Sequence, residues 1–222
     1  MSGIEHSSCK NAALHDRATA QVVGIAMSAG GLQPLRQLLA ALPESFPAAI
    51  VIVQHIGKFS ELPAILQPAL RLSVKFADDN ELLRGGTIYV SPPDRHILVK
   101  PDRTFGLPDT PRVRFQRPSA DWFFRSMAAA FQEHGTAVML SGCLDDGVRG
   151  IRFVHSAGGL VIAQDPRTCE RSSMPVAAIA TGIVDEVLAP EQIASTLSTW
   201  SHNGDRERAT REWEQPFMFA YA

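Results

Sequence analysis

The stretch VVGIAMSAGGLQPLRQLLAAL, residues 22–42, decides the fold class of this chain. An apolar run ends at Met27 and is followed at once by Ser28, by the glycines Gly30 and Gly31, and by a helical pattern. The apolar run predicts a buried strand, and the leucines that follow on one face predict an amphipathic helix. A strand that turns tightly into a helix is the repeating pattern of α/β proteins.

The rest of the chain repeats this alternation of strand and helix. After the strand at 22–27 and the helix at 32–42, further strands are expected at 48–54, 137–140 and 160–163, with an edge strand at 184–188. Further helices are expected at 61–70, 120–131, 147–156 and 176–181, with a closing helix at 190–200. A hairpin of strands 87–90 and 97–100 is expected around SPPDRH, and the helix at 120–131 is expected to turn Trp122, Phe123, Met127 and Phe131 inward. This order predicts an α/β fold with a doubly wound, mostly parallel sheet flanked by helices and with a small β-hairpin insertion. Residues 1–20 and 201–222 are predicted to be tails outside a single domain at 21–200.

Composition excludes several classes of protein. The chain has 222 residues, 45% of them hydrophobic and 20% charged, with a net charge of −2. A nucleic-acid-binding protein is usually basic, so no nucleic-acid partner is expected. No apolar run reaches the length of a membrane span and the N-terminus lacks a signal-peptide core, which predicts a cytoplasmic protein without membrane insertion. The cysteines Cys9, Cys143 and Cys169 are too few and too far apart to predict a disulfide framework or a metal site.

Chemically useful side chains follow three of the predicted strands. Ser28 follows the first strand, His55 follows the second, and the sequence SGCLDDG with Asp145 and Asp146 follows the strand at 137–140. The carboxyl ends of parallel strands meet at one edge of a sheet, so these side chains are expected on the same edge. Serine, histidine and aspartate together can form a nucleophile, its base and the carboxylate that orients the base.

Each of these residues also has a purely structural interpretation. Ser28 could cap the helix that follows it, and His55 could be a hydrogen-bonded core histidine. The Asp-Asp-Gly sequence is an ordinary turn. A phosphate-binding loop is disfavoured, because neither G-x-G-x-x-G nor G-x-x-x-x-G-K-[ST] is present at the Ser28 turn. Cys143 is a rival nucleophile, although a structural or backbone role is favoured.

Seven ordered blocks of sequence carry a resemblance to a known family. They are GIAMSAGGLQPL, VIVQHIGKF, IYVSPPDRHI, QRPSADWFFRSMA, MLSGCLDDGVRG, VIAQDPRTC and SSMPVAAIATGIVDEVL. In this order they resemble the chemotaxis receptor methylesterases, the CheB-type protein-glutamate methylesterases, over about residues 21–200. The resemblance implies a carboxylic ester hydrolase that demethylates glutamate γ-methyl esters of chemoreceptors in chemotaxis signalling. Some members of the family also deamidate receptor glutamines.

The resemblance also implies roles for individual residues. The family's catalytic triad falls on Ser28, His55 and Asp146, and Asp145 stands where the family has asparagine. Backbone N–H groups at Cys143 and in the Ser28 turn, which includes Ala29, are expected to bind the oxyanion. Ala29 replaces the usual threonine, Cys143 the usual methionine, and Leu144 the usual glycine. No cofactor and no metal are expected.

The expected partners follow from the same resemblance. The substrate would be the cytoplasmic domain of a methylated chemoreceptor, and a methyltransferase or another signalling protein is a further partner. About 20 residues precede the first strand, so we expect no N-terminal receiver domain and no response to phosphodonors. Two alternatives remain open: an inactive interaction domain of the same fold, and a serine esterase for another substrate. The C-terminal aromatics Trp213, Phe217, Phe219 and Tyr221 favour packing on the domain over a docking peptide.

Overall fold

Strand β1 (Val22–Met27) lies at the centre of a parallel sheet, and all of its residues are buried. A computed structural model of the chain describes residues 19–55 and 59–202. Within these residues the main sheet has seven strands in the order β3-β4-β2-β1-β7-β8-β9, and every neighbouring pair is parallel. The chain builds outward from β1 in both directions, as in doubly wound α/β folds. The predicted fold class is therefore confirmed.

The remaining elements alternate along the chain as expected. The other strands of the main sheet are β2 (Ala49–Gln54), β3 (Ser73–Phe76), β4 (Thr87–Val90), β7 (Gly135–Met139), β8 (Leu160–Gln164) and β9 (Glu186–Leu188). A separate antiparallel hairpin joins β5 (Leu98–Val99) to β6 (Phe105–Gly106). The helices are α2 (Leu32–Ala40), α3 (Leu62–Leu66), α4 (Ala120–Phe131), α5 (Gly150–Ser156), α6 (Ser173–Ile179) and α7 (Pro190–His202). Short 3₁₀ turns lie at Gln67–Ala69, Gln132–His134 and Pro166–Thr168.

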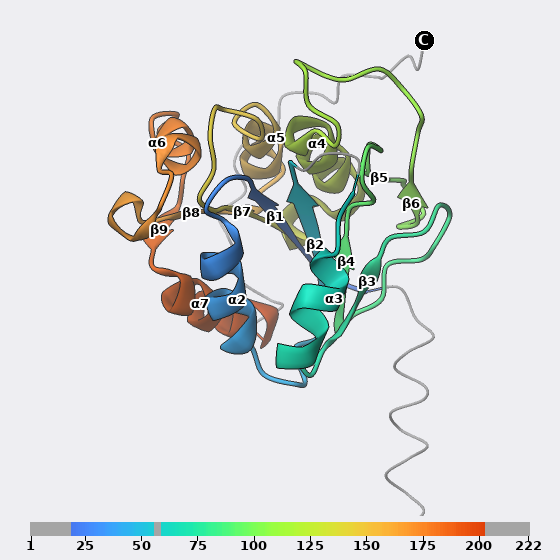
Figure 1. Cartoon of the computed structure of the whole chain (residues 1–222), viewed down its shortest axis with the longest axis horizontal. Helices are drawn as coiled ribbons and strands as arrows, with labels where there is room; N and C mark the ends of the chain where they lie inside the picture. The colour runs from blue at the N-terminus through green and yellow to red at the C-terminus, as the bar shows by residue number, and fades with distance from the viewer. Residues whose placement is uncertain (1–18, 56–58, 203–222) are drawn as a thin grey trace, which may run out of the picture.

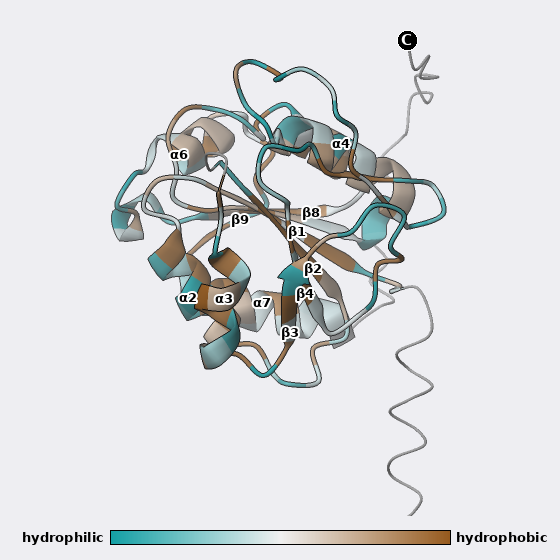
Figure 2. Ribbon diagram, turned by 45° about the vertical axis from the view of Figure 1, so that its right-hand side comes forward, coloured by the Kyte–Doolittle hydropathy of each residue, from teal (hydrophilic) through white to brown (hydrophobic). Residues whose placement is uncertain are grey.

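Helices cover both faces of the sheet. Figure 1 shows α4 and α5 on one side of the strands and α2, α3 and α7 on the other. Alternate residues of β1 point to the two layers, so that Val22 and Ala26 join one hydrophobic core and Ile25 and Met27 join the other. Burial on both faces explains why the strands are continuous apolar runs, which Figure 2 shows in brown between the helices.

The predicted hairpin of residues 87–90 and 97–100 is wrong in one of its strands. Residues 87–90 form β4, which pairs in parallel with β2 and β3 inside the main sheet. Ile88, Tyr89 and Val90 are all fully buried, as expected of an internal strand with two covered faces. The hairpin that does form pairs Leu98–Val99 with Phe105–Gly106, and two residues per strand leave little periodic signal in the sequence.

Several helix predictions also need correction. In α4 the buried aromatics are Phe123, Phe124 and Phe131, whereas Trp122 is half-buried and stacks on His96 with ring centroids 4.9 Å apart. Helix α5 begins at Gly150 rather than at 147, because residues 145–149 form a turn. The helix expected at 61–70 ends at Leu66 and continues as a 3₁₀ turn, and β3 was not predicted.

Both predicted tails fall largely outside the described residues, at 1–18 and 203–222, and the predictions made for them stay predictions. Among the described residues, no helix has the length and apolar character that crossing a bilayer requires.

Gly24 in β1 provides a test of this packing. A Cβ atom at this position would lie 2.6 Å from Phe123 Cε1 and 2.9 Å from Phe124 Cε1, so α4 must move away from the sheet to admit it. We expect Gly24→Ala to lower the free energy of unfolding by about 1–3 kcal/mol, measured by urea denaturation.

Gly106→Ala is the matched control for Gly24→Ala. The nearest atom to its Cβ is Lys100 Cε at 3.2 Å, on the flexible end of a side chain that can move aside. Equal losses of stability in the two variants would contradict the close β1–α4 contact.

Candidate active site

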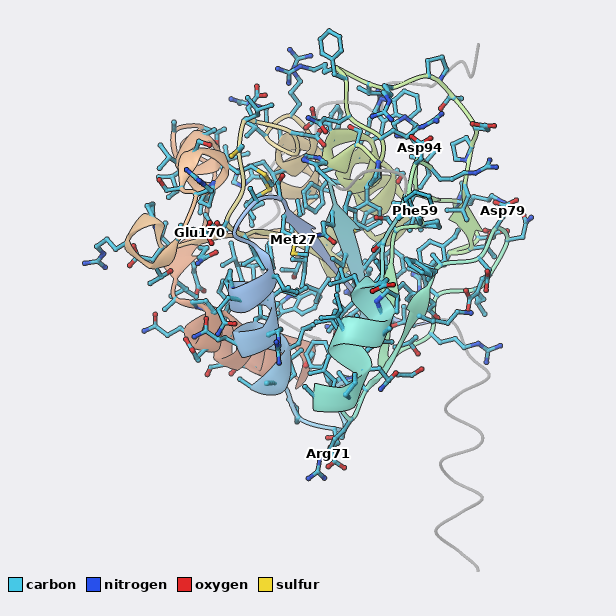
Figure 3. All side chains as sticks on the ribbon, in the orientation of Figure 1. Met27, Phe59, Arg71, Asp79, Asp94 and Glu170 are labelled. Carbon is cyan, nitrogen blue, oxygen red and sulfur yellow. The ribbon has the colours of Figure 1, made fainter. Side chains whose placement is uncertain are left out.

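The register of the sheet places Ser28 and His55 side by side. Met27 pairs with Gln54 at the ends of β1 and β2, so the next residue of each strand emerges at the same carboxyl edge. His55 N donates to Met27 O at 3.3 Å, and Ser28 N donates to Ser141 O at 3.1 Å on the side of β7. Ser28 is thus enclosed by the ends of both neighbouring strands. Figure 3 shows Met27, the residue before Ser28, between Glu170 and Phe59 in this view.

The turn after Ser28 is shaped by its two glycines. Gly30 has φ +75°, and a Cβ there would lie 2.8 Å from Ser141 Oγ and 2.7 Å from Glu170 Cβ. Gly31 N donates to Ser28 O at 3.0 Å, and Gly31 is the N-cap of α2 without any side-chain cap hydrogen bond. Ser28 therefore does not cap the helix, and the structural interpretation of this serine as a cap is wrong.

His55 and Asp146 are joined by a short hydrogen bond. His55 Nε2 lies 2.6 Å from Asp146 Oδ2, and each side chain is 9% exposed. An ionised carboxylate can only accept, so Nε2 carries a proton, and in the neutral imidazole Nδ1 is the nitrogen with the lone pair. Nδ1 is buried and has no hydrogen-bond partner among the described residues, and no bond between it and Ser28 Oγ is formed in this part of the chain. Catalytic hydrogen bonds are often formed only once substrate is bound.

The Asp146 carboxylate is surrounded by donors. Besides His55, Ala120 N donates to Oδ2 at 2.7 Å, while Ser119 Oγ and Asp121 N donate to Oδ1 at 3.0 and 3.2 Å. Burial is the largest single influence and by itself raises the pKa of Asp146, but the hydrogen bonds from His55 and from the backbone together outweigh it. The net pKa is lowered below the ordinary value of 3.8, so this buried carboxylate stays ionised at neutral pH.

The neighbouring Asp145 has a different environment. Its side chain is half exposed, and both of its oxygens accept from Arg114 Nη2 at 3.0 and 2.9 Å. The structure therefore brings Asp146, and not Asp145, to the histidine. Asp145 instead connects the loop after β7 to the loop before α4.

Backbone N–H groups suited to an anion lie beside Ser28. A Cβ on Gly142 would approach Ser28 Cβ to 3.1 Å and Ser28 N to 3.2 Å, so the chain that leads into Cys143 passes directly against the serine. Among the described hydrogen bonds, neither Cys143 N nor Ala29 N is used as a donor. Oxyanion holes are commonly built from backbone N–H groups that are free to bind an anion.

Sequence reasoning missed two residues that support this site. Ser119 stands at the N-cap of α4, but its hydroxyl donates to Asp146 instead of capping its own helix. Ser141 is fully buried, and its Oγ lies 3.2 Å from Ala29 O and 3.0 Å from Arg171 N. Ser141 thus fastens the Ser28 turn to the loop before α6. Only the position of Ser119, just ahead of a helix, gave a sequence signal.

The described cysteines differ in exposure. Cys143 is exposed, whereas burial and then the charge of Asp165 raise the pKa of Cys169 to about 11, so Cys169 is a neutral thiol. In residues 19–55 and 59–202, no group of three His, Cys, Asp or Glu side chains is arranged to hold a metal ion.

Comparisons with known proteins agree with this geometry. The sequence pattern of the CheB methylesterase family matches residues 23–197. The chain belongs to the CheB methylesterase family. The crystal structure of the Thermotoga maritima CheB methylesterase catalytic domain superposes with a TM-score of 0.78 at 34% identity, covering 81% of this chain and 97% of that one. The predicted family is therefore confirmed.

Relatives of two lengths match this chain. A protein of Leptospira interrogans is 36% identical over 190 residues, which is 85% of this chain and 98% of that protein. The protein-glutamate methylesterase/protein-glutamine glutaminase 3 of Anaeromyxobacter dehalogenans is 42% identical over 183 residues, but the match covers only 54% of its length. The matched region thus makes up nearly all of one relative and about half of the other.

The lowered pKa of Asp146 predicts how stability depends on pH. A carboxyl whose pKa is lower in the folded state stabilises the protein above its unfolded pKa, and this contribution is lost as pH falls through the folded pKa. We expect Asp146→Asn to cost about 1–3 kcal/mol at pH 6, with the difference from wild type shrinking once pH falls below the ordinary value of 3.8 and through the lowered folded pKa. Urea unfolding at several pH values measures it. A difference that stays constant as pH is lowered well past 3.8, for as long as both proteins remain folded without urea, would show that the charge contributes nothing.

Proposed function

We propose that this protein is a protein-glutamate methylesterase that removes γ-methyl groups from glutamates of methylated chemoreceptors and releases methanol. The observation that carries the proposal is the buried His55–Asp146 pair, set at 2.6 Å beside Ser28 at the carboxyl edge of the sheet. The membership of the chain in the CheB family supports the choice of substrate.

The first half of the reaction forms an acyl-enzyme. His55 Nδ1 takes the proton of Ser28 Oγ as the oxygen attacks the ester carbonyl, and Asp146 stabilises the imidazolium through Nε2–H. The two imidazole nitrogens therefore exchange the roles that they have in the serine protease template, because here Nε2 faces the carboxylate. Methoxide is a poor leaving group, so His55 returns the proton to it as the C–O bond breaks.

The oxyanion of the tetrahedral intermediate needs donors that are fixed in place. We assign these to the backbone N–H groups of Cys143 and Ala29, which are not engaged elsewhere among the described residues. One such donor is typically worth about 3 kcal/mol of transition-state stabilisation. Both donors belong to the backbone, so the side chains at these two positions can differ from those usual in the family without loss of the hole.

Water completes the cycle by the same route. His55 deprotonates a water molecule, the hydroxide attacks the acyl-enzyme, and Ser28 leaves with the proton from His55. The same acyl-enzyme would form from a glutamine side chain with ammonia as the leaving group. Glutamine deamidation is therefore a second reaction that this site can support, and the name of the A. dehalogenans relative includes it.

The reaction requires a protein partner. The methylated segment of a chemoreceptor lies in the cytoplasm, and we propose that the protein acts there, with a methyltransferase as its functional counterpart. We propose no metal and no cofactor for the chemistry.

The decisive experiment measures volatile methanol. The purified protein is incubated with receptor membranes that carry radiolabelled methyl groups, and Ser28→Ala is the matched control. Release by the wild type alone supports the proposal. Saturable receptor binding without release would indicate an interaction domain, and hydrolysis of simple esters without release from receptors would indicate another esterase.

Ser28 and His55 should behave as one catalytic unit. We expect Ser28→Ala and His55→Gln each to lower kcat by roughly 10⁴ to 10⁶, and the double variant to be little worse than either single one. Thermal unfolding should be nearly unchanged in Ser28→Ala, since the half-buried hydroxyl does not fill the core. Two losses that multiply in the double variant would show that His55 acts independently of Ser28.

The two adjacent aspartates should differ sharply. Asp146→Asn should lower kcat by about four orders of magnitude, because an amide facing Nε2 selects the wrong tautomer of His55. Asp145→Asn is the matched control and should cost less than about threefold, since it only weakens an exposed ion pair with Arg114. Initial rates of methyl ester hydrolysis measure both, and the reverse ranking would overturn the assignment of Asp146.

A further inference from the structure

Asp121, the second residue of α4, lies against the turn that carries Asp146. Its side chain is buried, and Oδ1 accepts three backbone hydrogen bonds, from Gly147, Arg149 and Gly150, each at 2.9 Å. These three residues follow Asp146 directly and lead into α5. A single carboxylate oxygen of Asp121 thus binds the backbone of the turn between Asp146 and α5.

The contact is reciprocal. Asp146 accepts from Ala120 N and Asp121 N at the start of α4, while Asp121 accepts from the start of α5. Neither helix is capped by its own N-cap side chain, which is Ser119 in α4 and Arg149 in α5. Each helix start is instead neutralised by the carboxylate that belongs to the other, which satisfies its free N–H groups and its positive dipole end.

The backbones are in close contact at the same point. A Cβ on Gly150 would lie 2.9 Å from both the Cα and the carbonyl oxygen of Asp121, and Gly147 has φ +99°. The turn therefore fits against α4 only in this conformation. Because Asp146 directly precedes Gly147 in the chain, a shift of the turn also moves Asp146.

This arrangement costs more than capping requires. Burial first, and then the negative charge of Asp146, raise the pKa of Asp121 above its ordinary value, so the ionised form is disfavoured. An asparagine side chain also offers a carbonyl oxygen as acceptor and would avoid a second buried charge. The titratable and charged groups around Asp121 and Asp146 are His55, which follows β2, and Arg114 on the loop before α4. The convergence of three backbone donors on one oxygen, directly after Asp146 in the chain, points to a role beyond capping.

We propose that Asp121 is a positioning residue for the reaction: it holds residues 147–150 against α4, so that Asp146 keeps its hydrogen bond to His55. The expected loss of kcat rests on the proposed function, whereas the expected loss of the His55–Asp146 hydrogen bond does not. Asp121 does not touch the reacting atoms and acts only through Asp146.

The test compares three variants. Asp121→Ala removes the acceptor, whereas Asp121→Asn keeps a carbonyl oxygen that can accept the same three N–H groups. Asp185→Ala is the matched structural control, because Asp185 Oδ2 accepts Val161 N at 2.8 Å near the amino end of β8, at the opposite edge of the sheet from the triad. If Asp121→Ala does not fold, Asp121→Ser, whose short hydroxyl cannot gather all three donors, takes its place.

Two readouts separate positioning from stability. In steady-state hydrolysis of a small glutamate methyl ester, Asp121→Ala should lower kcat by about 10- to 100-fold with KM changed less than about threefold, as expected when a reacting group is misplaced. In proton NMR, the low-field signal of the His55 Nε2–H bonded to Asp146 should be present in the wild type and lost in Asp121→Ala. Asp121→Asn should restore the signal and most of kcat, and Asp185→Ala should lower only the melting temperature.

The opposite results are equally clear. If Asp121→Ala lowers the melting temperature as Asp185→Ala does but keeps kcat and the signal, Asp121 is only a cap and the proposal is wrong. Loss of the signal in folded Asp121→Asn would also overturn it, since the acceptor would then not suffice. The proton signal needs no substrate, so failure of the wild type to hydrolyse esters would reject the proposed function and leave the positioning test intact.

Discussion

The parallel register of β1 between β2 and β7 is the constraint on which the rest of the structure depends. Met27 pairs with Gln54 on one side, and Ala26 pairs with Met139 on the other, so three strands end together at one edge. Because β1 is buried on both faces, a slip of one residue would exchange its two sets of side chains between the helical layers. The register is therefore strongly specified by packing, and the relative position of Ser28 and His55 follows from it.

The carboxylate of the site is placed by a different kind of interaction. Asp146 is buried, and a buried charge is stable only if its lone pairs are satisfied. The donors come from residues 119–121 at the start of α4, distant in sequence and adjacent in space. With those donors present the carboxylate remains ionised, and an ionised carboxylate fixes which nitrogen of His55 is protonated. Helix packing thus controls the proton on the imidazole.

Sequence predicted the features that repeat or that follow a strand directly. The apolar runs located β1, β2, β7 and β8, and the rule that parallel strands end at one edge placed Ser28, His55 and Asp146 together. It failed where short elements leave no periodicity, as in β3 and the β5–β6 hairpin. It also failed to find Ser119 and Ser141 as supports of the site, because hydrogen bonds between distant segments leave no local pattern.

The loop after β7 shows why departures from the family pattern need not alter the site. Leu144, which the sequence resemblance matches to a glycine, has φ +68°, a conformation that costs a leucine about 1–2 kcal/mol. Its side chain is 66% exposed, so it meets no steric obstacle, and the ion pair of Asp145 with Arg114 holds the next residue in place. The loop therefore accommodates leucine in this conformation, and the adjacent Cys143 N is not used as a donor among the described hydrogen bonds. A loop that contributes its backbone to the chemistry can change its side chains as long as its dihedral angles are preserved.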